Sequence, residues 1–312
     1  MRSLRCLVVL ALVLSAAAFA RGAEEPYAIF LGTGAADIET PKRCGCETCT
    51  YIREHGGLNA RRFSSLFVAP DIVIDYSTTG RDGLTMAGLS PATVNHLVLT
   101  HSHGDHFNEA EIVALAEARA KEKEGPLHIW GDPTVAEKMR AHIKGLDREV
   151  PITIHEVRPY QQVTIGDWTA KALPANHDAN EECLLWVLRR GDRALFYATD
   201  TGWFPVGTFG ALRSERLDVA IVEGTFGPLD GPELLTGHLN FDFARRIRRF
   251  LVEQKVLKPG GTFALTHLSL HAVPPYDRIH EQMAEEGILI PHDGMRVSIS
   301  AEKVTAPARA AE

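Results

Sequence analysis

The sequence predicts an α+β fold in which two β-sheets are layered with helices, and three observations support this prediction. Short apolar runs rich in β-branched and aromatic residues recur along the chain, with Gly, Pro and Asp between them. Strongly helical patterns are fewer, and no internal repeat or low-complexity linker divides the chain. Many strands with a few interspersed helices bury their apolar faces as stacked layers. In a chain of 312 residues we therefore expect one large domain, over residues 21–312.

Apolar runs of strand length define the expected sheets. They are residues 28–32, 64–69, 71–76, 96–101, 127–131, 163–166, 184–190, 194–200, 217–224, 262–267 and 295–300. Gly191 and Asp192, between two of these runs, predict a hairpin turn. Two segments have helical periodicity: 108–124, which begins with Asn108 as an N-cap, and 240–255.

The first 20 residues are typical of a secretory signal peptide. Arg2 and Arg5 precede the apolar run 7–14, and Ala18-Phe19-Ala20 fits a small-x-small cleavage site. The apolar stretch is short for a membrane span, so an uncleaved anchor is the weaker alternative. We expect a mature chain of residues 21–312, periplasmic or secreted, with no stable membrane insertion after cleavage.

The composition is that of an ordinary globular protein, with 45% hydrophobic and 23% charged residues. The net charge of −7 disfavours a nucleic-acid partner, because phosphate binding needs a basic surface. We therefore expect a small-molecule substrate. The oligomeric state stays open, with a homodimer as one alternative.

Metal-binding side chains gather at the ends of several apolar runs. The stretch "LTHSHGDHF" supplies His101, His103, Asp105 and His106 directly after the run 96–101. Three further candidates close later runs, namely His177, Asp200 and His267. Zinc accepts imidazole nitrogen and carboxylate oxygen readily. Because strand ends can meet at one edge of a sheet, these residues predict a metal cluster.

This pattern resembles that of the metallo-β-lactamase superfamily over nearly the whole mature chain. The resemblance implies a four-layer αββα sandwich and a dinuclear site that holds two Zn²⁺ (or Mn²⁺) ions. It implies that His101, His103 and His177 bind the first metal. It further implies that Asp105, His106 and His267 bind the second metal, and that Asp200 bridges both.

A narrower resemblance links the segments "GTGAADIETPKRCGCETC" and "NARRFSSLFV" to the PhnP-type phosphodiesterases. It implies a structural Zn²⁺ in a Cys-rich insert at 41–50. The ligands would be Cys44, Cys46, Cys49 and a late histidine, for which His271 is the nearest candidate. A disulfide after export is the alternative, although it would leave the third thiol unpaired. The resemblance also implies a catalytic role for His238, which would protonate the leaving group.

The expected reaction is hydrolysis. A pair of metals about 3.5–4 Å apart can hold a bridging hydroxide and stabilise developing negative charge. Asp105 and Asp200 would orient the hydroxide, and His238 would donate a proton to the departing oxygen. The leading hypothesis is an exported phosphodiesterase for small, including cyclic, phosphodiesters. One alternative is hydrolysis of another ester, a thioester, a lactone or a β-lactam. The other is a non-catalytic binding protein that resembles the B-type proteins of pyrroloquinoline-quinone biosynthesis.

Overall fold

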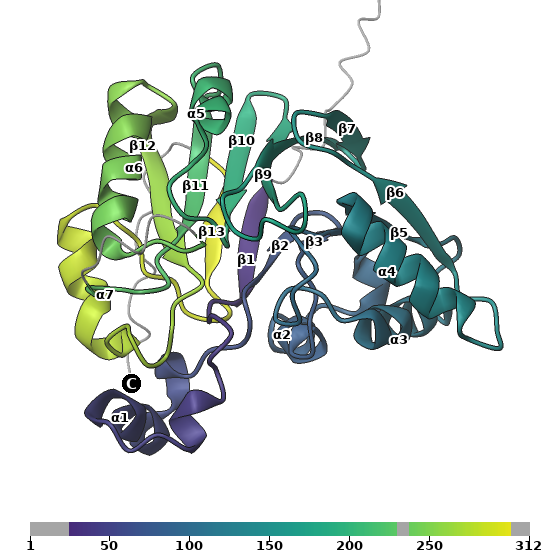
Figure 1. The fold of residues 1–312 in the computed structure, drawn as a ribbon, viewed down its shortest axis with the longest axis horizontal. Helices are drawn as coiled ribbons and strands as arrows, with labels where there is room; N and C mark the ends of the chain where they lie inside the picture. The colour runs from purple at the N-terminus through teal and green to yellow at the C-terminus, as the bar shows by residue number, and fades with distance from the viewer. Residues whose placement is uncertain (1–24, 230–236, 301–312) are drawn as a thin grey trace, which may run out of the picture.

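The computed structural model describes residues 25–229 and 237–300, so the expected signal peptide at 1–20 lies outside the described residues. Two sheets form the centre of the fold (Figure 1). The first has the order β13 (Arg296–Ser298), β1 (Tyr27–Gly32), β2 (Ser65–Val68), β3 (Ile72–Ile74), β4 (His96–Val98), β5 (Leu127–Gly131), β6 (Ile152–Glu156). The second has the order β12 (Leu257–Thr266), β11 (Leu217–Glu223), β10 (Arg193–Ala198), β9 (Leu184–Arg190), β8 (Trp168–Pro174), β7 (Gln162–Ile165).

Helices cover the outer faces of both sheets (Figure 1). They are α2 (Gly80–Met86), α3 (Glu109–Ala120), α4 (Pro133–Lys144), α5 (Val206–Leu212), α6 (Phe241–Glu253) and α7 (Tyr276–Glu285). A further helix, α1 (Glu47–His55), lies apart from the sheets, below α7 in this view (Figure 1). Three short 3₁₀ turns complete the described elements: η1 (Thr40–Lys42), η2 (Gly57–Asn59) and η3 (Pro91–Thr93). No helix within the described ranges has the length and apolarity needed to cross a membrane.

Three buried apolar clusters show how the layers pack. The cluster between the sheets joins Phe30 and Leu66 of the first sheet to Trp168 and Trp186 of the second. A second cluster joins the outer face of the first sheet to α2, α3 and α4. The third joins the outer face of the second sheet to α5, α6 and α7. The order helix, sheet, sheet, helix confirms the expected αββα sandwich.

Every apolar run named from the sequence overlaps a strand, and both helical segments form helices, α3 and α6. The run 96–101 is longer than its strand, because β4 ends at Val98 and the next residues belong to a loop. The sequence analysis missed β6, a half-buried edge strand. It recognised only the end of β8, in the stretch 172–177 that His177 closes, because the core positions of that strand include small alanines. It also missed α1, α2, α4 and α7, because their apolar stripes are short and lie among many polar residues. It missed α5 because that helix has only seven residues and two of them are glycines.

Two indole groups join the sheets through hydrogen bonds. Nε1 of Trp186 on β9 donates to the carbonyl oxygen of Leu99, 3.1 Å away. Nε1 of Trp168 on β8 donates to the carbonyl oxygen of Ala69 at 3.0 Å. Leu99 directly precedes the histidine-rich loop. The Trp186 bond therefore fixes the start of that loop against the second sheet.

We predict that Trp186→Phe destabilises the protein by about 1–3 kcal/mol, because the buried Leu99 carbonyl loses its donor. The free energy of unfolding from denaturant titration measures this loss. Trp203→Phe is the matched control, since Trp203 is only partly buried. Equal losses in both variants would contradict a special role for the Trp186 hydrogen bond.

Candidate functional site

All seven residues of the expected dinuclear site meet at one edge of the sandwich. His101, His103, Asp105 and His106 lie in the loop after β4, His177 follows β8, Asp200 follows β10 and His267 follows β12. Asp200 and His267 have left-handed backbones, with φ of 50° and 54°. Such a backbone costs free energy for a non-glycine residue and is typical of functional sites.

One group of donors consists of His101, His103, His177 and Asp200. Nε2 of His177 lies 3.1 Å from Nδ1 of His103 and 3.4 Å from Oδ2 of Asp200. Nε2 of His101 lies 3.7 Å from the same oxygen. Three imidazole nitrogens and one carboxylate oxygen are a donor set that suits zinc and similar divalent metals.

The second group consists of Asp105, His106, Asp200 and His267. Nε2 of His106 and Nε2 of His267 are 3.2 Å apart, and each lies 3.0 Å from Oδ1 of Asp200. Oδ2 of Asp105 is 3.3 Å from the His106 nitrogen and 3.4 Å from the His267 nitrogen. Asp200 therefore turns one carboxylate oxygen toward each group.

Unsatisfied buried atoms support metal binding by these residues. Nε2 of His101 and Oδ1 of Asp200 are buried and take part in no hydrogen bond. An unpaired buried polar atom is costly, and a cation between the groups would remove that cost. Burial alone would raise the pKa of Asp200, but the facing histidines, His106 foremost, hold it well below its usual range. The chain thus gathers carboxylate and imidazole donors around one small volume.

Hydrogen bonds orient all five imidazole rings. In four rings Nδ1 is the donor. His101 donates to Thr100 Oγ1 and His106 donates to Asp75 Oδ2. His177 donates to the Gly237 carbonyl oxygen, and His267 donates to Thr225 Oγ1. His103 is reversed, because its Nε2 contacts Asp178 Oδ2 at 3.2 Å. In each ring the other nitrogen faces the donor groups. This arrangement fixes the tautomers and raises the basicity of metal ligands.

Two buried carboxylates that the sequence analysis missed anchor this network. Asp75, at the end of β3, accepts hydrogen bonds from His106 and from the backbone N–H of Thr100. Glu223, the last residue of β11, accepts from Thr201 N, Thr225 Oγ1 and Leu239 N. Both carboxylates end apolar runs, just as the predicted ligands do, so the strand-end rule could have found them.

His238 lies beside both donor groups. Its ring is 4.9 Å from the His177 ring and 5.3 Å from the His267 ring, and its Nδ1 is 3.1 Å from Oε1 of Glu223. Burial disfavours the charged ring, but the Glu223 carboxylate outweighs burial and raises the pKa of His238 to about 9. A protonated imidazole therefore lies next to the two donor groups at neutral pH.

An open cavity of about 360 Å³ gives access to the site. Its lining includes His103, His177, His238, Asp37 and Phe226. Among the described residues, no Lys or Arg lines it. The negative charge of a substrate would therefore be balanced only by metal ions and by His238.

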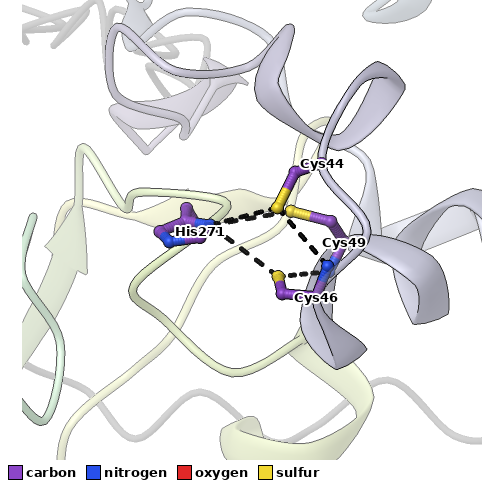
Figure 2. A group of neighbouring side chains, drawn as sticks. All are labelled: Cys44, Cys46, Cys49 and His271. Carbon is purple, nitrogen blue, oxygen red and sulfur yellow. Dashed lines mark hydrogen bonds between the residues drawn. The ribbon is translucent and has the colours of Figure 1, made fainter.

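The Cys-rich insert forms a third donor group with His271 (Figure 2). Nδ1 of His271 lies 3.7 Å from the sulfurs of Cys44 and Cys46, and 3.9 Å from the sulfur of Cys49. All three cysteines are free thiols in this structure. The backbone N–H of Cys49 lowers the pKa of Cys46 to about 7, whereas burial raises that of Cys49 to about 12. Crowded thiols ionise together only beside a cation, so the group suits a closed zinc site.

The short segment from His267 to His271, here called the strap, carries two histidines that belong to different donor groups. His267 begins the strap and His271 ends it. Asp37, which lines the cavity, accepts hydrogen bonds from Ser269 Oγ at 2.7 Å, Leu270 N at 3.0 Å and His271 N at 3.2 Å. The strap thus links the Cys-rich insert to the cavity.

We predict that Asp178→Asn lowers the metal affinity of the first group about tenfold, because the partner that orients His103 is weakened. Competition with a chelator of known affinity measures the change. Asp178 is partly exposed, so the substitution is compatible with folding. Asp192→Asn, at a strongly exposed site in the β9–β10 turn, is the control and should leave the affinity unchanged. The same affinity in both variants would contradict the assigned role.

Residues 72–274 match a family model described as a beta-lactamase superfamily domain, which covers more than half of the chain. Among curated proteins, ribonuclease Z of Methanothermobacter thermautotrophicus is 31% identical over 97 residues, which are 30% of this chain. The chain spans about a third of that relative, because the match covers 31% of its length.

Two solved structures have similar folds. One is a diphosphatase from the PhnP family, with a TM-score of 0.66 and 20% identity, covering 88% of this chain and 97% of that one. The other is Zn²⁺-bound PqqB from Methylobacterium extorquens, with a TM-score of 0.65 and 14% identity, covering 87% and 99%. At these identities the likeness establishes the fold alone.

Proposed function

The chain belongs to the β-lactamase superfamily, and on this premise we propose that it is a metal-dependent phosphodiesterase for small, including cyclic, phosphodiesters. The observation that carries the proposal is the position of His238, a proton donor, beside two donor groups that share Asp200. A proton donor is most useful when the leaving group is an alkoxide, as in a phosphodiester. The similarity to a ribonuclease and a diphosphatase agrees with chemistry at phosphorus.

The proposed ligands follow from the two groups. His101, His103 and His177 would hold one divalent metal, and Asp105, His106 and His267 would hold the other, with Asp200 shared. When bound, such a pair of metals supplies Lewis acidity and lowers the pKa of water to about 7. Zinc and manganese both suit nitrogen and oxygen donors. Cys44, Cys46, Cys49 and His271 would hold a structural Zn²⁺.

The protein's own groups have separate roles in the proposed reaction. Asp105 and Asp200 accept hydrogen bonds from the attacking water and so direct it toward phosphorus. His238 holds its proton on the cavity side, because Glu223 occupies its Nδ1, and gives it to the departing oxygen from Nε2. Glu223 stabilises the charged ring before that transfer and keeps its orientation.

The cavity favours a small monoanionic diester over RNA. The described lining contains Asp37, Asp105 and Asp200 but no Lys or Arg, and the whole chain carries a net charge of −7. An RNA backbone would need cationic contacts along several phosphates. Esters, thioesters, lactones and β-lactams remain competing substrates, and a non-catalytic role like that of PqqB remains the competing class. Turnover by the metal-loaded protein separates these from the proposal.

We predict about three metal equivalents per chain in the mature protein, together with hydrolysis of bis(p-nitrophenyl) phosphate. Cys46→Ser should remove one equivalent and keep turnover, whereas His101→Ala should abolish turnover, since it removes a ligand of the first metal. Cys183→Ala is the control, because Cys183 is buried and belongs to none of the three donor groups. Elemental analysis measures the metal content, release of p-nitrophenolate measures turnover, and thiol titration counts the free cysteines. Two equivalents with two thiols lost in the unmodified protein would indicate a disulfide instead.

We predict that His238→Gln slows hydrolysis of an alkyl phosphodiester by about 100-fold or more, because the leaving alkoxide loses its proton donor. Hydrolysis of bis(p-nitrophenyl) phosphate should slow far less, since p-nitrophenolate leaves without protonation. The kcat values for the two substrates measure this contrast. His142→Gln on α4 is the control. An equal loss with both substrates would contradict the general-acid role.

We further propose that residues 1–20 direct export and are then removed. The support is the basic start, the apolar run and the small-x-small site in the sequence. N-terminal sequencing of the protein from fractionated cells tests this, with Arg21 as the expected first residue in the exported fraction.

A further inference from the structure

A second cavity lies between the segment that carries the Cys-rich insert and α2. It encloses about 580 Å³, compared with about 360 Å³ for the cavity at the donor groups. None of the seven dinuclear-site residues lines it. Its volume falls within the range of small-molecule binding sites.

The segment 38–58, which contains the Cys-rich insert, supplies one wall of this second cavity. Arg53 of α1 holds that wall together, because its guanidinium donates to the carbonyl oxygens of Pro41 and Cys44. The opposite wall includes Met86 at the end of α2 and Leu270 of the strap. The first wall is therefore fixed by Arg53 of α1, and the second by α2 and by the strap.

Apolar side chains dominate the wall surface. They are Ile38, Pro41, Ile52, Leu58, Met86 and Leu270. Leu58 is 45% exposed and Met86 is 37% exposed, which makes them two of the few large hydrophobic residues left in solvent. Clustered apolar exposure of this kind marks binding surfaces. The wall can thus bury the apolar part of a ligand.

The charges around the cavity are unbalanced. Lys42 pairs with Glu39 at 2.6 Å, and Arg62 pairs with Asp293 at 3.4 Å. The remaining cations that line the cavity are Arg53 and Arg61.

Arg53 and Arg61 have no carboxylate within ion-pair distance in the described part of the chain. Arg61 is buried, with only 7% of its surface exposed. Its Nη1 donates to Thr33 Oγ1 at 2.6 Å and to the Pro291 carbonyl at 2.9 Å, while its Nη2 has no hydrogen-bond partner. Burial lowers the pKa of Arg61 to about 10, so it stays charged at neutral pH. The cavity therefore combines apolar walls with excess positive charge.

We propose that this cavity binds a small amphipathic anion, a molecule with an apolar body and one acidic head group. The apolar body contacts the walls, and the head group balances the charges of Arg53 and Arg61. A ligand there lies against Ile38 and Leu270, whose neighbours Asp37 and Ser269 line the catalytic cavity. The site is separate from the proposed hydrolytic centre and does not depend on its activity.

Fluorescence titration of the metal-loaded protein with 1-anilinonaphthalene-8-sulfonate tests this proposal. N-phenyl-1-naphthylamine has the same rings without the sulfonate and is the neutral comparison probe. We expect one sulfonate probe per chain, bound about tenfold or more tightly than the neutral probe. Octanoate should displace the bound probe, and octanol should not.

Two variants locate the probe. Leu58→Asp adds a negative charge to the apolar rim, and Arg62→Gln frees the charge of Asp293; each should weaken binding about tenfold. Val206→Asp, at a residue that is 88% exposed, and Arg148→Gln, an exposed partner of Glu117, are the controls. Both controls should bind like the unmodified protein. Equal affinity for the two probes, or unchanged affinity in both test variants, would overturn the proposal whether or not the protein hydrolyses phosphodiesters.

Discussion

The site depends on one constraint: five imidazole rings must each present one nitrogen to the same small volume. An unrestrained histidine can turn either nitrogen, so each ring needs a partner on its other side. Buried Asp75 accepts a hydrogen bond from His106. Thr225 accepts one from His267 and donates to buried Glu223. Buried carboxylates are costly unless they are fully hydrogen-bonded. The surrounding sandwich supplies those bonds, because backbone N–H groups of Thr100 and Leu239 donate to the two carboxylates.

Parallel strands explain why residues distant in sequence meet. β10, β11 and β12 are parallel neighbours, and their carboxyl ends carry Asp200, Glu223 and His267 to one edge. In the other sheet β3 and β4 are parallel, and they deliver Asp75 and the loop that contains His101. Because parallel strands end on the same side, a residue placed just beyond each strand joins the cluster without a long loop.

The sequence revealed the donors but not their supports. Histidines and aspartates beside apolar runs stand out by residue type, so the residues that form the two donor groups could be named in advance. Asp75 and Glu223 follow the same rule, yet a lone acidic residue at a strand end resembles a solvated turn residue. The structure distinguishes them, because both are completely buried and accept several hydrogen bonds. Burial depends on packing between segments far apart in the chain, which local patterns do not encode.

The strap from His267 to His271 connects the dinuclear site to the Cys-rich insert. Its spacing left the fourth partner of the cysteines uncertain in the sequence, because the path of the intervening residues decides where His271 points. Asp37 fixes that path by accepting three hydrogen bonds from the strap. The strap thus joins the insert to a residue of the dinuclear site. Each backbone N–H from Leu268 to His271 donates a hydrogen bond, so the path between the two donor groups is fixed along its length.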